Sequence, residues 1–122
     1  MREFKSFEVP EEITLLEFLE VEPIEANASD GYWCYEINDE NGRILRLSFD
    51  VFERSLQTSL YIGGEEIVTV SHEGATKLEI NSFSGNKILK CEFVSLETKT
   101  VLEICLKPKL LVRWGSLLTD RK

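Results

Sequence analysis

Residues 32–49 read YWCYEINDENGRILRLSF, and this stretch decides the fold. Its second half alternates apolar and polar residues, which places Leu45, Leu47 and Phe49 on one face of an extended strand. Its first half is rich in aromatic and β-favouring side chains. The pair Asn41-Gly42 between the halves is the strongest short signal for a tight hairpin turn. The stretch therefore predicts two antiparallel strands joined by residues 38–42.

The same rhythm of strand and turn continues along the chain. Short turn signals separate five further strand-like segments, which are 54–62, 66–72, 76–83, 87–96 and 100–106. Connections this short join antiparallel neighbours, because a parallel crossover needs a dozen or more residues. Residues 110–114 fit either a last strand or a packed tail. The sequence predicts a mainly β (α+β) protein, an antiparallel meander of about seven strands that forms a sandwich or an open barrel.

One helix is predicted near the N-terminus, within VPEEITLLEFLE at residues 9–20. Pro10 suits the first helical position, and the glutamates that follow it complement the positive end of the helix dipole. Leu15, Leu16 and Leu19 share a face, which we expect to cover one opening or edge of the sheet. Pro23 and the polar run 25–31 predict a loop.

Length and composition favour a single domain over residues 1–122. The three cysteines, Cys34, Cys91 and Cys105, are odd in number and widely spaced, so we interpret them as small buried apolar residues and not as a disulfide framework. No apolar run is long enough to span a bilayer, and the first residues lack the pattern of a secretory signal. The expected compartment is the cytoplasm.

The distribution of charge is the most informative feature of the composition. The net charge is −8, yet no Lys or Arg occurs from Ser6 to Gly42, a window that holds eleven acidic residues. The remainder of the chain is positive, and residues 107–122 are basic. A solvated acidic surface that aids solubility is one interpretation. The other is a field of one sign that captures a cationic partner. Under either interpretation, the acidic balance argues against binding to nucleic acid or to anionic membranes, which attract basic surfaces.

Motifs for catalysis are missing. His72 is the only histidine, and its place between Ser71 and Glu73 at a strand end is typical of an ordinary surface residue. The spacings of zinc ligands, of phosphate-binding glycine loops and of a nucleophile elbow do not occur. We therefore predict no enzyme activity, no metal site and no cofactor.

In size, acidity, strand-rich build and missing catalytic apparatus, the whole chain resembles the bacterial immunity proteins of contact-dependent inhibition and other polymorphic toxin systems. No single motif carries this resemblance. It implies a cognate toxin domain as partner, often a basic nuclease, blocked by occlusion of its active site. An acidic surface would mimic the substrate's charge and speed association. The residues expected to form it are Glu11, Glu12, Glu17, Glu20, Glu22 and Glu25, with Trp33 or Tyr35 as aromatic anchors.

Two other functions stay open. A β-barrel cup could enclose a small apolar ligand or serve an enzyme, and a deep cavity lined by inward residues would favour that interpretation. A homo-oligomer could form through unpaired edge strands, with the acidic segment of one copy against the basic residues 107–122 of another. The oligomeric state is not predicted.

Overall fold

A computed structural model describes residues 6–118 of the chain. It confirms a mainly β protein with one α-helix, and its strands form two antiparallel sheets of five and four strands. The chain divides into two compact units. We call residues 11–73 the helix-bearing unit, and residues 6–10 with 74–118 the C-terminal unit.

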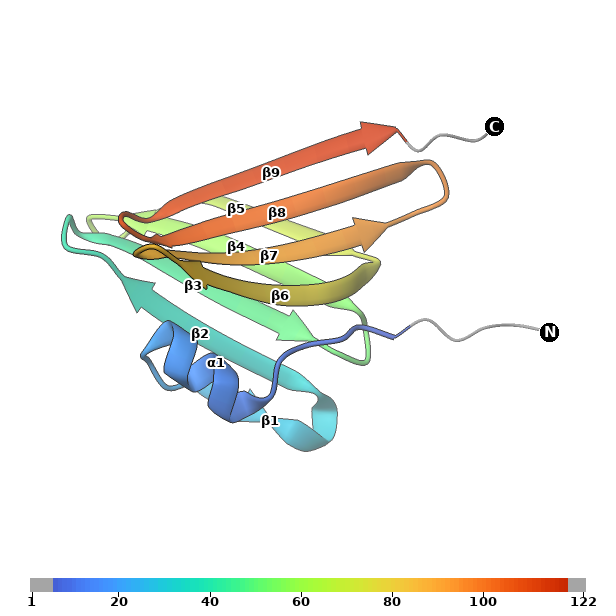
Figure 1. The fold of residues 1–122 in the computed structure, drawn as a ribbon, viewed down its shortest axis with the longest axis horizontal. Helices are drawn as coiled ribbons and strands as arrows, with labels where there is room; N and C mark the ends of the chain where they lie inside the picture. Colours follow the sequence, from blue (N-terminus) through green and yellow to red (C-terminus); the bar gives the residue numbers. More distant parts are fainter. Residues whose placement is uncertain (1–5, 119–122) are drawn as a thin grey trace. The chain divides into compact units, whose positions relative to one another are not determined.

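The helix-bearing unit carries the helix and the five-stranded sheet (Figure 1). Its elements are α1 (Glu12–Leu19), β1 (Glu25–Asn27), the 3-10 helix η1 (Ala28–Asp30), β2 (Tyr32–Asn38), β3 (Arg43–Asp50), β4 (Ser55–Ile62) and β5 (Glu65–Glu73). The strands lie in the order β1-β2-β3-β4-β5 and every neighbouring pair is antiparallel. The hairpin connections expected from the short turns are therefore confirmed.

The β2–β3 hairpin forms as the alternation predicted. Trp33 pairs with Phe49, and Tyr35 pairs with Leu47. In the turn, the Asp39 carboxylate accepts the backbone N–H of Asn41 at 2.8 Å and that of Arg43 at 2.9 Å. These bonds replace strand pairing where the chain reverses.

Burial of alternate residues shows which face of this sheet is apolar. The fully buried side chains of β2, β3 and β4 include Tyr35, Leu45, Leu47, Phe49 and Leu56. All of them belong to the face that also carries Trp33, as the pairing register requires. The opposite face carries the polar pairs Ser59 with Thr69 and Gln57 with Ser71.

The helix is shorter than the predicted segment. It begins at Glu12 and not at Pro10, because Glu11 still has extended backbone angles. It ends at Leu19, and Glu20 caps it by taking the left-handed conformation at φ +62° and donating its N–H to the Leu16 carbonyl at 2.8 Å. Leu15, Phe18 and Leu19 are buried and Leu16 is half-buried, but Ile13, which the sequence would also place at the margin of this apolar face, is exposed.

The C-terminal unit carries the four-stranded sheet. Its strands, β6 (Ala75–Phe83), β7 (Asn86–Val94), β8 (Thr98–Lys107) and β9 (Leu111–Leu118), lie in that order. Glu8 adds a short parallel bridge to Lys77 at the β6 edge. The ring centroid of Trp114 on β9 lies 5.4 Å from that of Phe93 on β7, so this tryptophan packs against the neighbouring aromatic residue of the same sheet.

Two strands exceed the predicted number of about seven. Strand β9 decides between the two interpretations of residues 110–114 in favour of a strand. Strand β1 forms inside the predicted loop, since the backbone of residues 25–27 pairs with β2. Residues 1–5 and 119–122, which include the first residues of the chain and part of the basic tail, lie outside the described residues. Within residues 6–118, α1 is too short to cross a bilayer and no apolar helix of spanning length occurs.

Candidate partner-binding surface

The two units differ strongly in charge. The helix-bearing unit has fifteen acidic and three basic side chains, a net charge of −12, while the rest of the chain has a net charge of +4. The three basic residues of the helix-bearing unit are Arg43, Arg46 and Arg54. The segregation seen in the sequence therefore coincides with a structural unit, which generates a long-range negative field around it.

Two of these arginines are paired with acids of the hairpin. Arg46 donates to Glu36 at 2.9 Å, and Arg43 donates to Asp39 at 2.7 Å. Desolvation in the turn raises the pKa of Asp39, but the backbone N–H groups of Arg43 and Asn41 and the Arg43 guanidinium outweigh it, so the pKa lies below its ordinary value. The acids of the hairpin are thus largely neutralised within the unit.

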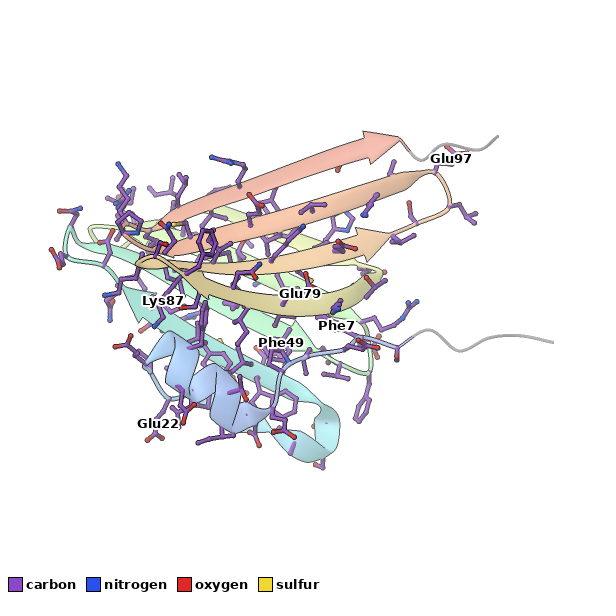
Figure 2. The ribbon with its side chains drawn as sticks, viewed as in Figure 1. Phe7, Glu22, Phe49, Glu79, Lys87 and Glu97 are labelled. Carbon is purple, nitrogen blue, oxygen red and sulfur yellow. The ribbon has the colours of Figure 1, made fainter. Side chains whose placement is uncertain are left out.

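The acids on and beside α1 are different. We call Glu11, Glu12, Glu17, Glu20, Glu22 and Glu25 the acidic helix surface, and all six are exposed. Figure 2 shows Glu22 pointing outward from the segment that follows α1. Among residues 6–118, no ion pair joins Glu11, Glu17, Glu22 or Glu25 to a basic side chain. Their charge remains available to a partner.

Trp33 links the acidic helix surface to the sheet. Its indole N–H donates to the Glu12 carboxylate at 2.6 Å, which joins the first turn of α1 to β2. On the same strand, Cys34 lies opposite Glu25 of β1. The helix and β1 therefore both meet β2 at Trp33–Cys34, and this junction brings Glu12 and Glu25 to the same end of β2.

The two aromatic anchors expected from the sequence lie in different environments. Trp33 is half-buried and stacks on Phe49, with ring centroids 5.7 Å apart. Tyr35 is 1% exposed and also stacks on Phe49. Burial, and then the charge of Glu12, raise the pKa of the Tyr35 phenol. Tyr35 is a core residue and cannot be the exposed anchor that the sequence suggested, because alternation assigns residues to faces without saying which face is buried.

One exposed aromatic residue of this unit could not be expected from the sequence. Phe52, in the turn between β3 and β4, is 67% exposed and borders an open hollow of about 450 Å³. The only signal in the sequence was a large apolar residue within a polar turn, between Asp50 and Glu53. A second open hollow, of about 570 Å³, lies over side chains that include Tyr32, Ser48, Gln57 and Ser71 of the polar face. Its largely polar lining differs from the apolar cavity that a ligand-binding barrel would need.

The groups that could do chemistry are scattered in the described part of the chain. His72 is half-buried, and its Nδ1 lies 3.1 Å from the carbonyl oxygen of Glu73. No cluster of three or more metal-ligating side chains occurs among residues 6–118. The three cysteines are free; Cys34 and Cys91 are buried as expected, whereas Cys105 is only half-buried. Burial raises the pKa of the Cys91 thiol to about 12, so it stays protonated.

Comparison with known proteins places the fold. No protein-family model matches the chain, and no curated protein matches its sequence. A chain in the solved structure of a contact-dependent growth inhibition toxin–immunity protein complex from Klebsiella pneumoniae 342 has the same fold, with a TM-score of 0.84. The two chains are 24% identical, and the match covers 91% of this chain and 97% of that chain. The fold is thus one that occurs in a toxin–immunity complex of the kind that the sequence resembles.

Proposed function

We propose that this protein is an immunity protein that binds a cognate toxin domain, a basic nuclease, and neutralises it by covering its active site with the acidic helix surface. The observation that carries the proposal is the fold shared with a chain of a toxin–immunity complex over nearly the full length of both chains. The net charge of −12 on the helix-bearing unit supports the cationic character of the partner.

The physical basis is substrate mimicry. A nuclease must attract phosphates, so its active-site cleft is lined by Lys and Arg. A surface of exposed carboxylates is attracted to the same cleft, and such steering raises association rate constants from about 10⁵–10⁶ to as much as about 10⁸–10⁹ M⁻¹s⁻¹ at low salt. Rapid capture suits this role, because free toxin continues to act until it is bound.

Glu12 and Trp33 would fix the surface in place. The hydrogen bond between them joins the helix to the sheet, and stacking on Phe49 holds the indole. The partner would then meet carboxylates on a supported backbone, which loses less conformational entropy on binding than a mobile loop does. In this role the protein acts without catalysis or a cofactor, in the cytoplasm of the cell that it protects.

Growth protection tests the proposal. The toxin would be the C-terminal domain of a large exported protein encoded immediately upstream of this chain in its source genome. Co-expression of that domain with this protein in a bacterial host should restore growth, and the two purified proteins should form a stable complex. Toxicity that persists in the presence of well-folded protein, or the absence of such an upstream gene, would contradict the proposal.

A further inference from the structure

The turn between β3 and β4 presents Phe52 on a fixed backbone. Its ring lies against Gly31, where an added Cβ would stand 3.1 Å from Phe52 Cδ2. Gly31 is buried and has φ +69°, and its carbonyl accepts the N–H of Val51 at 2.8 Å. The next bond in the turn joins the Glu53 N–H to the Asp50 carboxylate at 2.9 Å. The ring is 67% exposed and lies against Gly31 beside this hydrogen-bonded turn.

The hollow beside this ring is acidic. Its lining residues are Glu25, Asn27, Asp30, Tyr32, Asp50, Phe52 and Glu53, with four carboxylates and no basic side chain. Asp30 accepts a bond from the Asn27 amide at 2.9 Å, and Asp50 accepts the backbone bond in the turn. Among the described residues, no hydrogen bond or ion pair is made by the carboxylates of Glu25 and Glu53.

An exposed aromatic ring among carboxylates selects a particular chemistry. The face of the ring attracts a cation, and the carboxylates supply the acceptors that an organic cation needs for its N–H groups. Guanidinium fits better than ammonium, because it is planar, stacks on aromatic rings and donates to a carboxylate through two N–H groups. Among residues 6–118, no three or more His, Cys, Asp or Glu side chains are grouped so that they could hold a metal ion, these carboxylates included.

We propose that this hollow is the binding site for an arginine side chain of the partner protein, with Phe52 as the stacking platform and Glu25 and Glu53 as the acceptors. The identification of the partner as the toxin rests on the proposed function. Glu25 belongs both to the hollow and to the acidic helix surface. The site therefore extends that surface past β1 to the β3–β4 turn and adds an aromatic contact that charge alone does not provide.

A peptide experiment tests the site without the toxin. The probe is capped tri-arginine, titrated into the full chain carrying fluorine-labelled phenylalanine, with capped tri-lysine for comparison. Tri-arginine should shift the Phe52 resonance and leave that of Phe83, an exposed phenylalanine of the C-terminal unit, in place. The shift should weaken at least threefold in the double variant Glu25→Gln/Glu53→Gln. A Phe52 resonance that does not move, or that responds equally to tri-lysine, would overturn the arginine site.

Affinity for the upstream toxin domain tests the same site in its proposed role. Phe52→Ala should weaken binding about tenfold, as loss of an aromatic anchor does, while Phe52→Tyr should stay within threefold of wild type. Phe83→Ala, which removes a similarly exposed ring, should have no effect. Thermal unfolding of each variant verifies the fold. If Phe52→Ala binds the toxin like wild type, the inference fails although the immunity role stands; if tri-arginine binds as expected but the toxin does not, the site stands and the immunity role fails.

Discussion

The hydrogen bond from Trp33 to Glu12 should be measurable as a coupling free energy. The two residues are 21 positions apart, and the N–H to carboxylate distance is 2.6 Å. The bond is exposed, so water competes for both groups. Its net contribution to the free energy of unfolding should lie between that of an exposed ion pair and that of a buried charged hydrogen bond. We expect about 1 kcal/mol. In a protein of this size that amount corresponds to about 4 °C in melting temperature.

A double-mutant cycle isolates this value. Trp33→Phe removes the N–H donor and also part of the stacking area on Phe49, while Glu12→Gln removes the charge of the acceptor. The loss of ring area is common to both sides of the cycle and cancels in the coupling term. Urea unfolding of wild type, both single variants and the double variant gives the coupling. The matched control replaces Glu12→Gln with Glu17→Gln, because Glu17 is an exposed glutamate of the same helix.

The expected result is a coupling of about 1 kcal/mol for the Trp33–Glu12 cycle and a value within the error of about 0.3 kcal/mol for the control cycle. Equal coupling in both cycles would refute the reasoning, because it would show that the indole responds to the charge of the helix in general. The helix would then be held to the sheet only by its apolar side chains.

Three further predictions concern the turn at Asp39, the cysteines and the glycines. The pKa of Asp39 is lower in the folded protein than its ordinary value of 3.8, so the ionised carboxylate stabilises the fold above pH 3.8 and this stabilisation is lost as the pH falls through the folded pKa. Asp39→Asn should therefore reduce the melting temperature at pH 7, and the difference from wild type should close below pH 3.8. An equal gap at pH 7 and pH 2.5 would contradict this. The Cys91 thiol, with its pKa of about 12, should resist alkylation at pH 8 in the folded protein, and Cys105 should react before it. Mass mapping of the modified peptides measures the order of reaction. Modification of Cys91 before Cys105 would show that its strand opens. Gly74→Ala should lower the free energy of unfolding by about 3 kcal/mol, because Gly74 has φ +85° and an added Cβ would lie 2.8 Å from the Val94 carbonyl oxygen. Gly63→Ala, at φ +61° with open space around it, should lower it by about 1–2 kcal/mol in the same urea assay. Equal losses would show that the strand of Val94 moves to make room for the added Cβ.

The sequence predicts the hairpin of residues 32–49 well, because alternation and the Asn41-Gly42 turn are local signals. It does not predict β1, because residues 25–27 (Glu-Ala-Asn) carry no strand pattern and pair with β2 through their main chain. It also gives no sign that the strands divide into two sheets after Glu73. Pairing between distant strands depends on the whole chain, and no short window contains that information.

The acidic helix surface could be predicted as a set of exposed carboxylates, since a run without Lys or Arg has no local counter-charge. Its geometry could not. The bond between Glu12 and Trp33 joins residues far apart in the sequence, and the burial of Tyr35 depends on which face of β2 is covered. Phe52 could not be predicted, because an apolar residue in a polar turn gives no signal in the sequence until the structure shows its exposed ring lying against Gly31.

The most direct test is the rate at which this protein associates with the upstream toxin domain, measured by stopped-flow fluorescence at increasing salt. Two triple variants have the same change in net charge: Glu17→Lys/Glu20→Lys/Glu22→Lys on the acidic helix surface, and Glu79→Lys/Glu97→Lys/Glu103→Lys in the C-terminal unit. The proposal predicts that the first slows association at least tenfold at low salt and flattens its salt dependence, while the second changes it less than threefold. Equal slowing by both triple variants, or by neither, would contradict recognition through the acidic helix surface.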